Sequence, residues 1–208
     1  MIETGKKQEK VILVAAATEE IEKAERSLDE LGELVKTAGA EVCGRMIQAR
    51  DMIHTGTYIG SGKLDELKWL VWEKEADGIV CDDELSPVQL KNLEEALDCK
   101  IMDRTLVILD IFAARASTKE GKIQVELAQL KYRQSRLTGL GKSLSRLGGG
   151  IGTRGPGEKK LEMDRRLIKN RIAQLNRELA DVRRHREITR EKRSQNHIPV
   201  CALVTVSR

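Results

Sequence analysis

A glycine-rich, basic stretch has residue types and spacing that could hold a phosphate group. Residues 150–155 read GIGTRG and match the G-x-G-x-x-G pattern of dinucleotide-binding loops. That pattern works only after a strand in a βαβ unit, where the pyrophosphate meets the amino end of a helix. Here residues 143–147 (SLSRL) precede it and follow a heptad-patterned segment. The context therefore argues against a dinucleotide site.

The neighbouring Gly141-Lys142-Ser143 resembles the end of a Walker A phosphate-binding loop. That motif needs a glycine five residues before Gly141, and Arg136 stands there. A plain flexible linker is also a poor interpretation, because basic and apolar side chains alternate with the glycines. What remains is a basic segment whose exposed backbone N–H groups and arginines can contact nucleic-acid phosphates. A disordered protein-binding loop stays the alternative.

The expected ligand is folded RNA, recognised by shape and backbone. Tyr132 is the region's lone aromatic residue, whereas modules for single-stranded RNA rely on stacking platforms. The predicted RNA-binding residues combine the glycine-rich segment with flanking cations: Lys142, Arg146, Gly148, Gly149, Gly150, Ile151, Gly152, Thr153, Arg154, Gly155, Pro156, Gly157, Lys159, Lys160, Arg165, Arg166 and Arg171.

Two heptad-patterned segments flank this stretch and must position it. Apolar residues recur at alternating spacings of four and three, as in coiled-coil seams. We expect an antiparallel helical hairpin over residues 118–196 with a glycine-rich tip loop at 138–159. The first seam comprises Ile123, Leu127, Leu130 and Leu137 with Gln134 in one position, and the second comprises Ile168, Ile172, Leu175, Leu179 and Val182.

The preceding residues, 1–117, alternate short apolar runs with helical patterns, which indicates βαβ crossovers. The fold class predicted is therefore α/β, a small, largely parallel sheet domain flanked by helices and followed by the hairpin. Expected strands cover residues 11–16, 41–48, 78–81 and 100–103, and expected helices cover 18–36, 64–75 and 86–97.

Charge is segregated along the chain. Residues 1–117 carry 15 Lys and Arg against 24 Asp and Glu, a balance of −9, whereas residues 118–194 carry 21 against 9, a balance of +12. A basic half on an acidic half suggests a polyanion-binding face on a carrier domain, because clustered cations gain free energy by releasing counterions from nucleic acid. A solvated pair of charged helices is the alternative.

The remaining chemistry-bearing residues do not form a metal or redox pattern. The four cysteines are far apart and are interpreted as buried thiols, and the three histidines have no ligand spacing, so no metal site is expected. Asp82, Asp83 and Asp103 at expected strand ends are interpreted as turn and cap residues. A nucleotide site near Asp82 and Asp103 is the enzyme alternative. Trp69 and Trp72 are interpreted as packing residues.

No apolar run approaches the length of a membrane span, and residues 1–10 are polar and unlike a signal peptide. From these features we expect a cytoplasmic protein without a membrane span.

Four blocks, in order, resemble the HflX family of GTPases. They are YIGSGKLDEL (58–67), DDELSPVQLKNLE (82–94), DRTLVILDIFAARASTKEGKIQVELAQLKYR (103–133) and GGGIGTRGPGEKKLEMDRRLIKNRIAQLNREL (148–179). The resemblance spans nearly the whole chain. It departs at Lys159 and Met163, where threonine is more usual in the family.

The resemblance implies an α/β domain, a helical hairpin and then a GTPase domain that uses GTP and Mg²⁺. Family members bind the large ribosomal subunit and split or rescue ribosomes, and the loop matching residues 148–157 is expected to reach ribosomal RNA. A regulatory role, in which these residues restrain the GTPase domain through protein contacts, is the alternative.

Residues 198–204 (IPVCALV) resemble the first strand of that GTPase domain, of which residues 197–208 are expected to be a remnant. Because no Walker A loop follows them, the 208 residues are expected to bind no cofactor and to catalyse no GTP hydrolysis.

Overall fold

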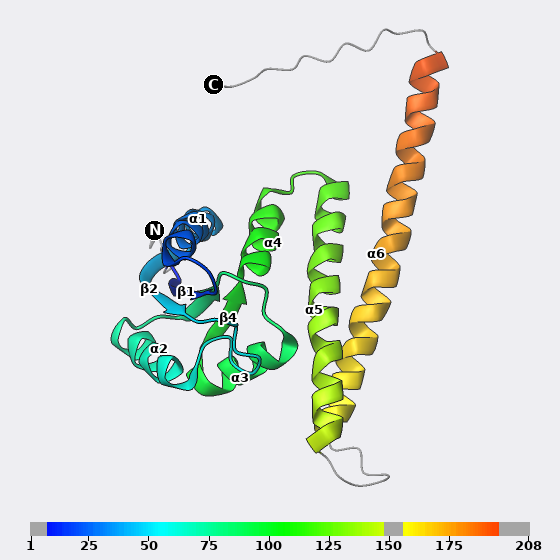
Figure 1. The fold of residues 1–208 in the computed structure, drawn as a ribbon. Helices are drawn as coiled ribbons and strands as arrows, with labels where there is room; N and C mark the ends of the chain where they lie inside the picture. Colours follow the sequence, from blue (N-terminus) through cyan, green and yellow to red (C-terminus); the bar gives the residue numbers. More distant parts are fainter. Residues whose placement is uncertain (1–7, 148–155, 196–208) are drawn as a thin grey trace, which may run out of the picture.

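The computed structural model describes residues 8–147 and 156–195, with side chains described for residues 8–137 and 163–195 (Figure 1). An α/β unit is followed by two long antiparallel helices. The strands are β1 (Lys10–Ala17), β2 (Glu41–Ala49), β3 (Gly78–Cys81) and β4 (Lys100–Asp103). The helices are α1 (Ile21–Ala38), α2 (Ser61–Glu73), α3 (Pro87–Leu97), α4 (Arg104–Arg115), α5 (Lys119–Leu147) and α6 (Pro156–Gln195).

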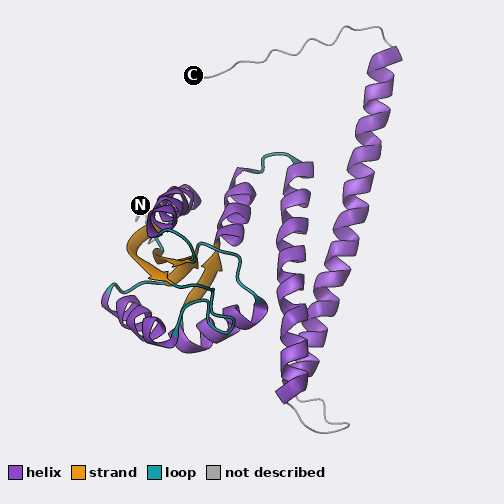
Figure 2. Ribbon diagram, in the orientation of Figure 1, coloured by secondary structure: helices purple, strands orange, loops and turns teal. Residues whose placement is uncertain are grey.

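The four strands form one parallel sheet in the order β2-β1-β3-β4. Helices cover both faces, so strand residues are buried whichever way they point, and central strands become continuous apolar runs. Successive residues of β1 accordingly serve two cores. Val11, Leu13 and Ala15 pack with α1 and α4, whereas Ile12 and Val14 pack with α2 and α3 (Figure 2). The predicted α/β class with a parallel sheet is confirmed.

Helix α4 is the element that the sequence did not reveal. It starts directly after β4, without an intervening turn, and Asp103 caps it by accepting the Leu106 N–H at 3.0 Å. Because strand and helix share one apolar stretch, periodicity alone does not separate them. Capping by Asp103 was among the interpretations offered for the strand-end carboxylates, and it is confirmed.

The hairpin has the predicted seam. Ile123, Leu127 and Leu175 form its buried centre, and Leu130, Ile172, Leu179 and Val182 pack around them. The predicted tip loop at 138–159 is too long, because α5 continues to Leu147 and α6 begins at Pro156. Two isolated glycines cost a helix only about 1 kcal/mol each, and proline is well suited to the first helical position.

A buried carboxylate fastens the hairpin to the sheet. Asp103, fully buried at the end of β4, accepts hydrogen bonds from the Tyr132 hydroxyl and the Arg136 guanidinium of α5. It also accepts the Leu85 N–H at 3.2 Å. The Arg136 guanidinium lies over the Tyr132 ring, 4.2 Å from its centroid. Burial and the adjacent carboxylate raise the pKa of Tyr132, so its hydroxyl stays a donor.

The interpretation of the two tryptophans as packing residues is wrong, because both side chains are largely exposed. Trp69 is 58% exposed and Trp72 is 77% exposed on the outer face of α2. Leu67 alone among the α2 residues is fully buried, and the rest of the helix is shallowly packed. Within the described residues, no helix is long and apolar enough to cross a membrane.

We predict that Asp103→Asn lowers the free energy of unfolding by about 3–5 kcal/mol, because it leaves the buried Arg136 without its counter-charge. The control is Asp110→Asn on α4, where an exposed carboxylate accepts from Gln129 at 3.1 Å, and about 1 kcal/mol or less is expected. Urea unfolding of both variants measures the difference. Equal, small losses would show that the carboxylate on β4 does not hold the hairpin.

We also predict that Leu175→Ala lowers the free energy of unfolding by about 2–5 kcal/mol, because Leu175 is 1% exposed at the centre of the seam. Leu167→Ala is the matched change on the same helix, where the side chain is 59% exposed and an effect within about 0.5 kcal/mol is expected. Helical circular dichroism during urea unfolding follows both. A seam that tolerates Leu175→Ala as well as Leu167→Ala would contradict the hairpin packing.

Candidate nucleic-acid interface

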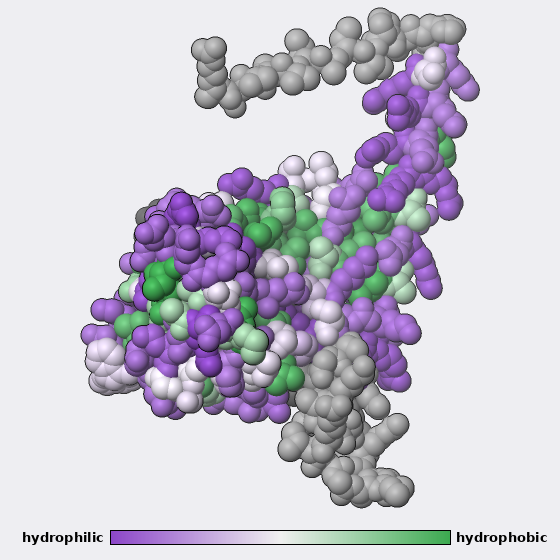
Figure 3. Space-filling model, viewed as in Figure 1, coloured by the Kyte–Doolittle hydropathy of each residue, from purple (hydrophilic) through white to green (hydrophobic). Residues whose placement is uncertain are grey.

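The candidate interface is the outer face of α6. Its seam residues face α5, and at about 3.6 residues per turn the opposite side of the helix carries Arg166, Arg177 and Arg184. All three side chains are exposed, and Lys169 lies beside this line. Figure 3 shows hydrophilic surface along much of the exposed length of α6. We call Arg166, Lys169, Arg177 and Arg184 the outer cations.

The outer cations differ in whether they form ion pairs with carboxylates of the protein. Across the side chains described, residues 8–137 and 163–195, no carboxylate lies within ion-pair distance of Arg166, Lys169 or Arg177. Arg184 has one partner, Asp181, at the 4.0 Å limit, with both side chains 74% exposed. Such a solvated pair contributes little energy. These cations therefore remain available for an external anion.

Other cations of α6 hold the hairpin together. Arg171 donates to Glu126 of α5 at 2.8 Å, and Arg186 donates to Glu120 at 2.6 Å, with Arg183 at 3.9 Å from the same carboxylate. The hydrogen bond that Arg171 donates to the Glu126 carboxylate raises the pKa of Arg171. Arg171 was predicted to contact RNA, yet its guanidinium bridges the two helices.

Arg165 is also turned toward α5. One of its terminal nitrogens donates to the Leu137 carbonyl, and its Nε is buried without a hydrogen-bond partner. Of the three predicted RNA-binding residues with described side chains, Arg166 alone is exposed on the outer face, with no described carboxylate within ion-pair distance. Arg165 and Arg171 tie α6 to α5. The heptad positions in the sequence could have distinguished Arg166 from the other two, because Arg165 and Arg171 lie beside the seam.

The other predicted RNA-binding residues are placed only in part. Lys142 and Arg146 lie in the last turns of α5, and Pro156, Gly157, Lys159 and Lys160 lie in the first turns of α6. Residues 148–155 lie outside the described residues. The amino end of α6 is thus placed at the hairpin tip, where the helix dipole favours negative charge.

The strand-end carboxylates proposed as a nucleotide or metal site are occupied by protein contacts. Asp82 accepts from Arg104 Nε at 3.0 Å, and Asp83 accepts the Tyr58 hydroxyl at 2.7 Å. Asp103 lies in the junction with α5. Within the described residues, no group of three or more His, Cys, Asp or Glu side chains could hold a metal ion. These carboxylates are engaged in contacts that stabilise the fold, although Asp82 and Asp83 also line a small cavity of about 170 Å³ beside α1.

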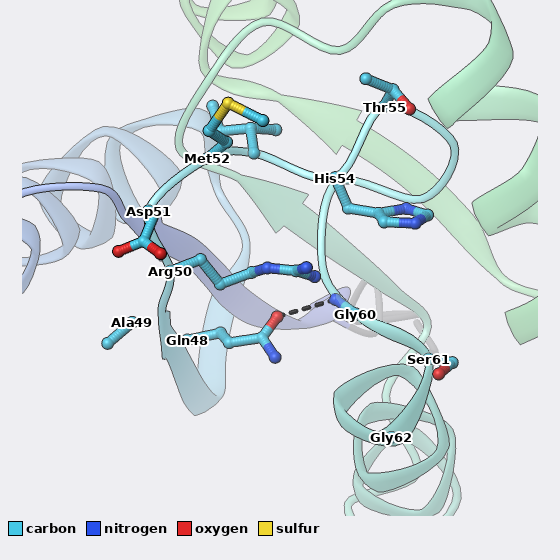
Figure 4. A pocket seen from close by; sticks show the side chains of 11 residues that line it. Gln48, Ala49, Arg50, Asp51, Met52, His54, Thr55, Gly60, Ser61 and Gly62 are labelled. Atoms are coloured by element: carbon cyan, nitrogen blue, oxygen red, sulfur yellow. Dashed lines mark hydrogen bonds between the residues drawn. The ribbon is translucent and has the colours of Figure 1, made fainter.

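A cavity that the sequence did not indicate lies instead beyond the carboxyl end of β2 (Figure 4). It measures about 680 Å³ and is lined by residues 48–55 and 60–62. Gln48 Oε1 accepts the Gly60 N–H at 2.7 Å, and a Cβ on Gly60 would come within 2.7 Å of Arg50 Nη1. Its charged lining residues are Arg50 and Asp51, so the lining has no net charge when His54 is neutral and does not select an anion by charge.

Comparisons with known proteins agree with the two-part architecture. Residues 25–113 match the family model described as GTP-binding GTPase N-terminal, and residues 115–193 match the one described as GTP-binding GTPase Middle Region. The boundary between them falls at residue 114, in the last turn of α4, just before the hairpin begins with α5.

Similar proteins are named GTPase HflX. The chain is 66% identical over 204 residues to the one from Lacrimispora saccharolytica, covering 98% of this chain and 48% of that protein. It is 44% identical over 177 residues to the one from Escherichia coli, covering 85% and 42%. The chain therefore spans about half the length of the relatives it matches.

Solved structures share the fold. A GTP-binding protein from the archaeon Sulfolobus solfataricus, in complex with GDP, superposes with a TM-score of 0.56 at 24% identity, covering 85% of this chain and 46% of that one. A complex of SsGBP and GDP gives a TM-score of 0.62 at 24% identity, covering 86% and 46%. The solved structures show the shared fold, and the family models and the sequence relatives establish the family. The chain belongs to the HflX GTPase family, of which it comprises the N-terminal and middle regions.

Proposed function

We propose that this chain is the ribosome-binding part of an HflX GTPase, and that its hairpin contacts RNA of the large ribosomal subunit. The observation that carries the proposal is the row of outer cations on α6, three of which have no carboxylate within ion-pair distance among the described side chains. The balance of +12 in residues 118–194 supplies the long-range attraction. Because phosphate contacts dominate such binding, affinity should fall steeply with salt.

We propose that different domains of the HflX protein bind the ribosome and hydrolyse GTP. The α/β unit and hairpin dock on the subunit, while a GTPase domain with GTP and Mg²⁺ hydrolyses nucleotide and drives the splitting or rescue of ribosomes. The 208 residues contain no Walker A sequence, and in this proposal they contribute RNA binding while the GTPase domain of full-length family members contributes hydrolysis. The setting of that activity is the cytoplasm, where ribosomes work.

The glycine-rich segment extends the same surface. Residues 148–155 connect two helices whose ends carry Lys142, Arg146, Lys159 and Lys160. Glycines let a backbone approach phosphates closely, and Arg154 can fork onto a phosphate or stack on a base. We propose that this segment makes the innermost RNA contact.

The alternative is a regulatory role, in which this region restrains the GTPase domain through protein contacts. Replacing Arg154, Lys159 and Lys160 by Ala separates the two. RNA contact predicts lost ribosome binding with unchanged folding, measured by cosedimentation and circular dichroism. The restraint role predicts normal cosedimentation.

We predict that the triple variant Arg166→Gln, Lys169→Gln and Arg177→Gln weakens binding to large subunits by about tenfold or more at low salt. It should also reduce the salt dependence of log K by about 1 for each phosphate contact removed. Sedimentation with purified large subunits over a salt series measures both quantities. Helical circular dichroism should be unchanged, because these side chains are exposed.

The matched control removes the same formal charge from the α/β unit, by Lys23→Gln, Lys36→Gln and Lys63→Gln. These lysines form local ion pairs on α1 and α2, and little change in affinity is expected. Equal losses of affinity in both triple variants would show that binding depends on the net charge of the protein and not on the outer cations of α6. Unchanged binding in the α6 variant would refute the proposed surface.

A further inference from the structure

Helix α2 exposes both tryptophans of the chain on one face. Trp69 and Trp72 are three residues apart and 58% and 77% exposed, whereas Leu67 on the inner side is fully buried. Over α2, at the lower left of Figure 3, near-white surface interrupts the hydrophilic surroundings. Large aromatic side chains are usually much more buried, and paired exposed indoles are typical of binding surfaces.

The charges around this face indicate which kind of partner it suits. Asp65 and Glu73 lie one turn before and one turn after Trp69, and both are exposed. In the described part of the chain neither carboxylate has an ion-pair partner. The cations nearest in sequence are Lys63, two residues before Asp65, Lys68, beside Trp69, and Lys74, which directly follows Glu73. The wider unit, residues 1–117, has a balance of −9. The face is therefore aromatic and acid-flanked, on an acidic domain.

Three occupants are disfavoured by this charge. An RNA backbone would be repelled by the domain, so base stacking on the indoles would lack the phosphate contacts that normally supply affinity. An anionic membrane surface attracts basic and not acidic segments. A second copy in a two-fold arrangement would bring identical acidic faces together.

We propose that the Trp69–Trp72 face of α2 is a docking site for a basic protein segment rich in arginine. Guanidinium groups stack on exposed indoles by cation–π attraction and pair with flanking carboxylates, so both features of the face are used by one partner. The site lies on the α/β unit, away from the outer cations of α6 (Figure 1). It is independent of the RNA-binding role of the hairpin.

The tryptophans themselves provide the measurement, because the chain has no others. The full chain is titrated with a peptide of arginine and alanine, while acrylamide quenching of tryptophan fluorescence is followed. Binding at the face should reduce the quenching constant about twofold, since it covers side chains that are now more than half exposed. Oligoadenylate, which offers bases and phosphates, should leave quenching unchanged even where the hairpin binds it.

A charge variant tests the flanking carboxylates. Asp65→Asn with Glu73→Gln should weaken peptide binding about threefold to tenfold, as expected for two exposed charge pairs. Glu22→Gln with Glu25→Gln on α1, on the opposite face of the sheet, removes the same charge and should leave the affinity unchanged. Protection by oligoadenylate in place of the peptide would overturn the proposal in favour of nucleic acid. Absence of protection by the peptide, or equal loss in both variants, would also overturn it.

Discussion

The arrangement of the molecule depends on one buried carboxylate. Asp103 ends β4, caps α4, accepts a backbone N–H from the loop before α3 and binds Tyr132 and Arg136 of α5. Three of these donors, from Leu85, Tyr132 and Arg136, reach Oδ2, and the Leu106 N–H reaches Oδ1. Because Arg136 is itself buried, the pair is tolerated only while both partners are in place. The hairpin is thus held to the sheet by a contact that is costly to break.

The hairpin is long and basic, and contacts between its two helices stabilise it. Repulsion among the cations of α6 is reduced on its inner side by Glu120 and Glu126 of α5, and the apolar seam supplies the packing. The outer side carries Arg166, Lys169, Arg177 and Arg184 with the exposed Asp181 as the ion-pair partner of Arg184 alone among the described side chains, so a cationic face is kept beside an acidic α/β unit. The fixed position of the hairpin and the cationic outer face of α6 together suit the binding of a polyanion.

Local signals in the sequence were sufficient for most of the fold. Strands β3 and β4 were predicted residue for residue, and Ser86 forms the expected cap of α3, strengthened by Gln89 in a capping box. The heptad seam was likewise apparent, since it repeats over several turns. Prediction failed where strand and helix share one apolar run, as at α4, and where single glycines were given too much weight, as in α5.

The site was less predictable because it depends on which way side chains point and on partners distant in sequence. Arg165 and Arg166 are adjacent, yet one binds the Leu137 carbonyl and the other faces solvent. Arg136, noticed in the sequence only because it excludes a Walker A loop, meets Asp103 across 33 residues. The exposure of Trp69 and Trp72 also depends on the shallow packing of α2, which composition does not encode.

The most direct test of the central claim is site-specific photocrosslinking to large ribosomal subunits. A photoreactive side chain at position 177 on the outer face of α6 is compared with one at position 25 on α1, both exposed. We expect crosslinks to ribosomal RNA from position 177 and none from position 25. Crosslinks from position 177 to protein alone, or RNA crosslinks of equal yield from both positions, would contradict this expectation.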